Sequence, residues 1–339
     1  MHKMIPLVGL LTLALVSLAG PLAGRAAAED QWAVLEGKEG PGKGKHVVLI
    51  AADDEYRSEE LIPALAKILA AHHGFKCTVL YAVNKQTGEI DPATLDNIPG
   101  LEALKTADLM ILFARWRELP DEQMKLIIDY VDSGKPLMGL RTSTHPFNYK
   151  TRKDSPYAKY SYNNKDFQGG FGRQILGETW VNHYGAHQKE STRGLIAPGM
   201  EACPIVKGCE DIWGPSDVYT ITTLTGDAKP VIMGQVLKAM DPKDPPNDAK
   251  KQVPVAWIKT YTGAQGKASR VFNTTMGHNG DFVSEGFRRL LVNATYWCMG
   301  MEDKIPAKAN VDLVGEYKPS PIGMAKFVKG KKPADLKLQ

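Results

Sequence analysis

The chain has 339 residues, of which 43% are apolar and 24% are charged, and its formal net charge is +4. These proportions are close to those of an average globular protein, which excludes a disordered acidic or basic tail, a collagen and a disulfide-dense miniprotein. The length suits one large α/β domain with insertions, or at most two small domains.

The first 28 residues have the features of a secretion signal. Lys3 gives a positive start, an apolar run extends from Ile5 to about Leu22, and residues 26–28 form a small-residue cleavage site before Glu29. A membrane anchor is the alternative, but no second apolar run of about 18 residues supports a membrane protein. We therefore expect an exported chain, periplasmic or secreted, with no integral membrane segment once the signal is removed.

The charge of the mature chain argues against a nucleic-acid partner. Residues 1–28 hold Lys3 and Arg25 and no acidic residue, so removing them lowers the net charge from +4 to +2. This charge is small, and the basic residues are scattered rather than gathered in a patch, so we expect no nucleic-acid binding.

Short apolar runs alternate with amphipathic helical patterns over the first part of the mature chain. Strands are expected at residues 46–51, 76–81, 107–113 and 136–140. One helix is expected between an N-cap at Ser58 and a stop at Gly74, and another from Pro120 to Gly134. This alternation predicts an α/β fold with a doubly wound, mostly parallel sheet flanked by helices.

The later part of the chain continues this pattern after a long interruption. Strands at residues 255–258 and 270–274 and a closing helix over about 287–298 fit the same sheet, whereas residues 142–250 look like long loop insertions. We expect a lead-in at 29–44, one domain at 45–300, and a lysine- and proline-rich tail at 301–339 that runs extended over the surface.

The four cysteines point to packing or to one disulfide. Export makes disulfides possible, and Cys203 and Cys209 bracket a short loop across which they could pair. Cys77 and Cys298 lie in apolar patterns and are expected to be buried small hydrophobes. Because no C-x-x-C pair occurs, a four-thiolate zinc site is excluded.

Polar residues gather after several of the predicted strands, at the edge where parallel sheets bind ligands. The candidate ligand-binding residues are Asp53, Asp54, Glu55, Arg115, Arg141, Thr142, Ser143, His145, Trp180, His187 and Asp281, with His183 and His278 as further candidates. Together they would line a polar pocket with aromatic walls, which suits a sugar or a small polar metabolite.

Some of these residues have simpler explanations. Asp53 and Asp54 are as well suited to capping the following helix as to contacting a ligand, and at least one of Arg115 and Arg117 is expected to be an ordinary surface charge.

For the histidines too, a functional explanation competes with a simpler one. His183 and His187 are four residues apart, as helical zinc ligands often are, but Gly185 between them makes hydrogen bonding the better explanation. His278 follows Gly277 at a strand end, where a tight loop aims the side chain, so a functional role is favoured there.

The turn after the fourth strand, residues 139–143 (Gly-Leu-Arg-Thr-Ser), is the most informative. Related folds place a nucleophile at such a tight strand-to-helix turn, but Arg141 occupies this position and arginine cannot be a nucleophile. Arginine can instead clamp a carboxylate or orient a carbonyl or hydroxyl oxygen. A Ser143–His145 pair is not assigned, because catalytic partners usually come from distant segments.

Five segments together resemble the ThuA-like proteins, a family named for trehalose utilisation. They are residues 139–141 (Gly-Leu-Arg), 177–183 (Gly-Glu-Thr-Trp-Val-Asn-His), 216–219 (Ser-Asp-Val-Tyr), 254–258 (Pro-Val-Ala-Trp-Ile) and 266–278, which end in Thr-Met-Gly-His. The resemblance covers roughly residues 45–300 and implies a class I glutamine amidotransferase-like, flavodoxin-like fold.

The family commonly has Gly-Leu-His and Asp-Glu-Leu-Tyr where this chain has Gly-Leu-Arg141 and Ser-Asp217-Val-Tyr219. No cysteine lies between Cys77 and Cys203, so glutaminase chemistry is excluded.

Three functions are open at this point. The first is an enzyme acting on a carbohydrate, such as an oxidised (keto) glycoside, with His183 and His278 as the acid and base and Arg141 orienting a substrate oxygen. The second is a non-catalytic sugar- or metabolite-binding protein. The third is a metal-dependent hydrolase using His183, His278 and Asp53. The sequence requires no cofactor, and a divalent metal is possible.

Overall fold

The computed structural model describes residue 1 and residues 31–336. The predicted secretion signal lies, apart from its first residue, outside the described residues. Within the described part of the chain, no helix is both long and apolar enough to cross a bilayer.

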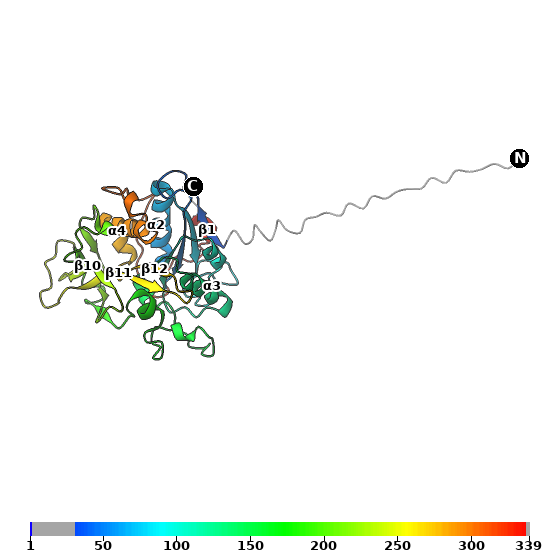
Figure 1. Ribbon diagram of the computed structural model, residues 1–339, viewed down its shortest axis with the longest axis horizontal. Coiled ribbons are helices and arrows are strands. Elements are labelled where there is room, and N and C mark those ends of the chain that lie inside the picture. The colour runs from blue at the N-terminus through cyan, green and yellow to red at the C-terminus, as the bar shows by residue number, and fades with distance from the viewer. Residues whose placement is uncertain (2–30, 337–339) are drawn as a thin grey trace.

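One ten-stranded sheet with helices on both faces forms the protein (Figure 1). The strands of this sheet are β1 (Trp32–Leu35), β2 (His46–Ala52), β3 (Lys76–Tyr81), β4 (Leu109–Ala114), β5 (Leu137–Leu140), β7 (Thr192–Ile196), β8 (Ile212–Gly214), β10 (Lys229–Val236), β11 (Val253–Thr262) and β12 (Ala268–Thr274). The helices are α2 (Ser58–His73), α3 (Asp121–Asp132) and α4 (Glu285–Cys298), and a separate two-stranded sheet pairs β6 (His183–Tyr184) with β9 (Val218–Tyr219).

The parallel half of the sheet has the order β3-β2-β4-β5-β12 and contains five of the six expected strands; the sixth, at residues 255–258, lies in the antiparallel strand β11. Its side chains are buried on both faces. Val47 and Leu49 of β2 belong to the core cluster that includes α2 and α4, whereas Val48 and Ile50 belong to the cluster that includes α3. Burial on both faces explains why these strands are apolar throughout rather than alternating.

The other half of the sheet is antiparallel. Strands β11, β10, β7 and β8 continue the order after β12, and β1 pairs antiparallel with β3 at the opposite edge. In Figure 1, β10 and β11 lie on the side of the molecule away from β1 and α3. The α/β class is therefore confirmed, but the sheet is mixed rather than mostly parallel. Residues 142–250 are not only loops, because β7, β8 and β10 lie within them and extend the sheet.

The helix after β2 begins differently from the prediction. Ser58 is the first residue of α2, and Arg57, with φ 60°, occupies the N-cap position without a side-chain cap. The Ser58 hydroxyl accepts a hydrogen bond from Asp53 N at 2.9 Å, because the chain turns sharply between Asp53 and the helix. This turn holds the loop 53–57 at the carboxyl end of β2.

The segment after α4 packs against the same loop. Ile305, Ala309 and Val311 are buried against the core cluster under α2 and α4. Farther along, Gly323 N donates to Glu55 O at 2.8 Å. Apart from short 3₁₀ turns at Glu302–Lys304 and Pro333–Leu336, residues 301–336 contain no regular element.

The cysteines are all free thiols. Cys77 and Cys298 are buried, as predicted. Cys203 and Cys209 are partly buried and are not joined to each other.

Candidate functional site

The candidate site lies where the carboxyl ends of the parallel strands meet the two-stranded β6–β9 sheet. Segments 53–57, 115–117, 141–145 and 275–281 follow β2, β4, β5 and β12, which run parallel and so end at one edge. The β6–β9 sheet pairs His183 with Tyr219. This pairing brings segments 183–187 and 216–219 to the same place.

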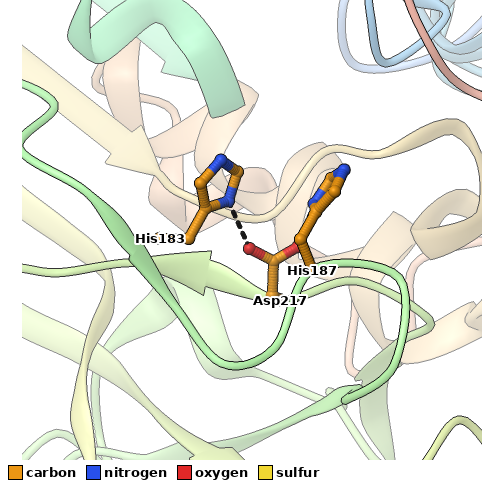
Figure 2. Close-up of side chains that lie close together, drawn as sticks. All are labelled: His183, His187 and Asp217. Atoms are coloured by element: carbon orange, nitrogen blue, oxygen red, sulfur yellow. Dashed lines mark hydrogen bonds and ion pairs between the residues drawn. The ribbon is translucent and has the colours of Figure 1, made fainter.

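One buried carboxylate, Asp217, is shared by two histidines (Figure 2). Asp217 Oδ2 lies 2.5 Å from His183 Nδ1, and Asp217 Oδ1 lies 2.9 Å from His187 Nδ1. The Asp217 side chain is 1% exposed and each imidazole is 31% exposed. Because an ionised carboxylate only accepts hydrogen bonds, each Nδ1 carries a proton. The Nε2 atom of His183 is therefore left for a substrate, whereas the Nε2 atom of His187 lies 3.2 Å from the exposed side-chain amide of Gln188.

The charge of this group follows from its surroundings. Burial by itself would raise the pKa of Asp217, but the hydrogen bonds from His183 and His187 and the charge of Arg141 outweigh burial and hold that pKa well below its usual range. The hydrogen bond to Asp217 raises the pKa of His187, against the opposing effect of burial. His187 therefore holds a second proton more readily than an isolated imidazole does.

Arg141 lies beneath the Asp217 group rather than at its open side. Its side chain is fully buried between the rings of Tyr56 and Tyr219, whose centroids are 4.2 and 4.7 Å from the guanidinium carbon. Nη1 donates to Thr275 O at 3.0 Å and to the main-chain oxygen of Asp217, and Nη2 is 3.6 Å from Asp217 Oδ1. Arg141 also has a φ of 45°, a strained value for a residue other than glycine. These contacts fix the position of Asp217 and leave no exposed face for a ligand.

The turn after β12 presents His278 as a neutral donor. His278 Nδ1 accepts a hydrogen bond from Gly280 N at 2.7 Å, so the proton of the neutral ring is on Nε2. Burial, and next the charge of Arg141, lower the pKa of His278 to about 3. The ring packs 6.2 Å from Tyr56, which also packs 6.2 Å from His187.

Asp281 ties this turn to the segment that carries Asp217, just before β9. Its Oδ2 accepts from Gly277 N at 2.9 Å, from His278 N at 3.1 Å and from the Ser216 hydroxyl at 2.9 Å. Burial raises the pKa of Asp281 to about 6, although the charge of Arg141 opposes the shift. The carboxylate is fully buried, so the structure places Asp281 behind the site as a support.

The acidic side chains of the loop after β2, Asp53, Asp54 and Glu55, mainly bond to the backbone of the same loop and to Arg115. Asp53 accepts from the main-chain N–H groups of Glu55 and Tyr56 and, at 2.9 Å, from the Thr142 hydroxyl. Arg115 forms ion pairs with Asp54 at 3.0 Å and with Glu55 at 3.3 Å. Glu55 Oε1 is also 3.8 Å from His187 Nε2, so Glu55 is the member of this loop nearest to the two histidines.

The residues after β5 do not form a nucleophile–base pair. The Ser143 hydroxyl donates to Leu112 O at 2.6 Å, and His145 Nδ1 lies 3.1 Å from the Thr144 hydroxyl. His145 is buried among four aromatic rings at centroid distances of 5.3–6.2 Å, those of Trp116, Tyr162, Trp180 and Tyr219. Burial lowers the pKa of His145 well below its usual value, so the ring is neutral.

Within the described ranges, one group of side chains has the spacing of a metal site. It consists of His183, His187 and Asp217, whose ligand atoms all lie within 4.8 Å of one another. The set His183, His278 and Asp53 suggested by the sequence does not form such a group, because Asp53 is committed to its own loop and His278 Nδ1 to Gly280.

Three residues central to this geometry are absent from the sequence-based candidates: Asp217, Tyr56 and Tyr219. Asp217 and Tyr219 do belong to the segment 216–219 that resembles the family motif, so that resemblance was the available signal. Tyr56 follows the acidic residues after β2 and carries no signal of its own.

Comparisons with known proteins found one matching family and several similar structures. A family model described as ThuA, trehalose utilisation, matches residues 47–298. A crystal structure of a ThuA-like protein from Parabacteroides merdae matches with a TM-score of 0.50 and 15% identity, covering 88% of this chain and 100% of that one. A second, from Bacteroides uniformis, matches with a TM-score of 0.46 and 16% identity, covering 77% of this chain and 93% of that one. No curated protein matches the chain.

Proposed function

The chain belongs to the ThuA trehalose-utilisation family, and we propose that it is an enzyme acting on a carbohydrate, specifically an oxidised (keto) glycoside. The observation that carries the proposal is the buried Asp217 carboxylate shared by His183 and His187. Nε2 of His183 is left for chemistry, and Nε2 of His187 meets only the exposed Gln188 amide and, at 3.8 Å, Glu55. Two such imidazoles beside a neutral histidine donor provide the groups that a proton-transfer reaction on a sugar needs.

A keto-glycoside would react at this site by elimination. His183 Nε2 takes the proton from the carbon next to the ketone, since Asp217 holds the other nitrogen of that ring protonated. The electron pair of the broken C–H bond forms a C=C bond, and the bond to the glycosidic oxygen breaks. Protonated His187 gives its proton to the departing oxygen. His278, a neutral N–H donor, hydrogen-bonds the ketone oxygen as negative charge develops there.

Arg141 acts in this scheme as a positioning residue. It is buried under Asp217 and touches the two tyrosine rings and main-chain oxygens rather than the open side of the site. A glutaminase reaction is not part of the proposal, because Arg141 occupies the turn where that chemistry needs a cysteine nucleophile.

The test is a ketoside assay with matched histidine variants. The wild-type chain is incubated with methyl 3-keto-glucoside and with methyl glucoside, and release of methanol is measured. We expect release from the ketoside alone. His183→Asn and His187→Asn should each lower kcat by about 100-fold or more, the usual contribution of a general acid or base.

His72→Gln is the matched control, because His72 lies at the end of α2, where its Nε2 is 3.0 Å from Asp312 O, and it is not one of the site residues. The proposal is wrong if the His183 and His187 variants release methanol as fast as the control. Binding of the ketoside without any conversion would favour the alternative of a non-catalytic sugar-binding protein.

A metal-dependent hydrolase is the second candidate, favoured by the spacing of His183, His187 and Asp217. Such a site would polarise a bound water for attack on the glycoside. Activity that is lost in chelator and restored by a divalent cation would establish this candidate. Activity that persists in chelator would remove it.

Export is also part of the proposal. It rests on residues 1–28 alone, through their positive start, apolar run and Ala-Ala-Ala end. Mass spectrometry of the chain recovered from its native cells should give a mature start at Glu29. An intact N-terminus would contradict export by this signal.

A further inference from the structure

A hollow next to the candidate site has an aromatic floor and a basic rim. Its volume is about 380 Å³, which is within the range of small-molecule sites. Trp116 and Tyr162 contribute the rings, and Asn148, Lys150 and Lys153 contribute polar groups. None of these five residues belongs to the Asp217 group described above.

Two ring contacts join this hollow to the reacting groups. The Tyr162 ring is 6.3 Å from Trp180, and Trp180 is 6.2 Å from His183. Trp116 and Tyr162 are themselves 6.0 Å apart, over the buried His145 ring. A ligand with more than one ring can therefore contact aromatic side chains without interruption from His183 to Trp116.

Trp116 is held in a costly conformation. Its φ is 50°, in the left-handed region that a bulky residue rarely adopts. Its indole Nε1 is buried and has no hydrogen-bond partner within the described part of the chain. A main-chain hydrogen bond from Trp116 N to His145 O, at 3.1 Å, holds the backbone of this residue. The guanidinium carbon of Arg115 lies 3.8 Å from the ring centroid and holds the indole in place. Strain of this kind is found where the position of a side chain matters for binding.

The rim of the hollow has an excess of positive charge. Lys150 Nζ is 5.8 Å from the Trp116 ring centroid. Among the described residues, neither Lys150 nor Lys153 has a carboxylate within 4.0 Å. The Glu118 carboxylate accepts through Oε1 from the main-chain N–H groups of Thr151 and Arg152, each at 2.6 Å, rather than from either lysine. Two ammonium groups beside a ring platform suit a ring that carries a carboxylate.

We propose that this hollow is a second binding subsite and that it holds an acidic sugar ring, a uronate, joined to the sugar that reacts at His183. The apolar face of the uronate packs on Trp116 and Tyr162, and its carboxylate lies between Lys150 and Lys153. That the two rings form one substrate rests on the proposed function, whereas binding of a uronate in the hollow does not.

Binding in the hollow can be measured separately from catalysis. The chain has six tryptophans, and Trp116→Phe identifies the indole N–H resonance of Trp116 in nuclear magnetic resonance spectra. Methyl glucuronide at millimolar concentration should shift that resonance in a saturable way, and methyl glucoside, its neutral match, should not. Lys150→Gln and Lys153→Gln should each weaken binding about two- to fivefold, the range of an exposed ion pair, and high salt should weaken it further.

Lys159→Gln is the matched control, because Lys159 also lies over aromatic rings, Tyr160 at 5.2 Å and Phe167 at 5.7 Å, but does not line the hollow. Equal binding of glucuronide and glucoside, no response of Trp116, or no effect of the two lysine variants would overturn the subsite. Loss of ketoside turnover in His183→Asn with unchanged glucuronide binding would support both proposals. Glucuronide binding without any ketoside turnover in the wild type would refute only the enzyme.

Discussion

Replacing Asp217 by asparagine tests the reasoning about the site most directly. The carboxylate accepts from two imidazole N–H groups, and asparagine offers one oxygen and one NH₂ group in the same space. One histidine can keep its N–H bond to the oxygen. The other must then accept from the NH₂ group through Nδ1, which moves its own proton to Nε2. A His183 with a protonated Nε2 cannot act as the base.

The cost to stability comes from Arg141. Removing one partner of a buried ion pair usually costs about 3–5 kcal/mol. Here Arg141 keeps its bonds to the main-chain oxygens of Thr275 and Asp217 and its two tyrosine rings, so we expect about 2–3 kcal/mol. With an unfolding entropy of about 2.1 cal/mol/K per residue over roughly 300 residues, that is a fall in Tm of about 3–5 °C. The loss of kcat should be about 100-fold or more, because either His183 is held in the wrong tautomer to act as the base or His187 loses the carboxylate charge that keeps it protonated as the acid.

Two measurements decide the matter. Thermal unfolding followed by circular dichroism gives the change in Tm, and methanol release from methyl 3-keto-glucoside gives kcat. Asp129→Asn is the control, since it removes only an exposed ion pair with Lys125 and should change the free energy of unfolding by less than about 0.5 kcal/mol. An Asp217→Asn variant with the Tm and kcat of the control would refute both the tautomer argument and the role of Arg141.

Three further predictions concern the fold around the site. His73 is buried between the Tyr296 hydroxyl at 3.0 Å and Asn310 O at 2.7 Å, and burial lowers its pKa. The unfolded chain therefore binds more protons than the folded chain below about pH 6.5, and the free energy of unfolding decreases as the pH is lowered, by up to about 1.4 kcal/mol per pH unit. His73→Gln should flatten that pH dependence in a series of urea unfolding curves. Gly139→Ala should destabilise by about 1–3 kcal/mol, because the added Cβ would lie 2.2 Å from Asn273 Oδ1 and 2.9 Å from Leu176 Cδ1; an unchanged urea midpoint would contradict the packing argument. Tyr317→Phe removes a 2.8 Å hydrogen bond to Asn279 O and should cost about 1 kcal/mol in the same assay, with a cost of zero showing that the segment after α4 does not brace the site.

The separate two-stranded β6–β9 sheet is what completes the site. The parallel strands alone place Arg141, His278 and Asp53 at one edge, but none of these offers an exposed base. The β6–β9 sheet, which lies in the region between β5 and β11, brings His183 and Asp217 over that edge. The site therefore depends on the parallel strand ends and on the β6–β9 sheet together, and neither of them would be expected to support the reaction by itself.

The expected location of the site follows from a general property of parallel sheets, and the structure brings most of the candidate residues to that edge. Their roles were less predictable. Asp53 and Ser143 are of residue types that often form binding sites, yet the side chain of each one is hydrogen-bonded to a main-chain group instead. Whether a polar side chain faces a ligand or its own backbone depends on dihedral angles at each turn, and a sequence pattern does not specify these.

The elements of the parallel half follow from local sequence. Apolar runs, helical periodicity and stops such as Gly74 act over a few residues, so strands β2–β5 and helices α2–α4 could be placed without a structure. Asp217 meets His183 from 34 residues away and contacts Arg141 from 76 residues away, through the β6–β9 pairing and the turn after β5. Contacts over such separations arise only when the whole chain packs, because no local period relates the residues that make them. The tertiary structure therefore decides which carboxylate orients the histidines, and why the arginine lies buried beneath it.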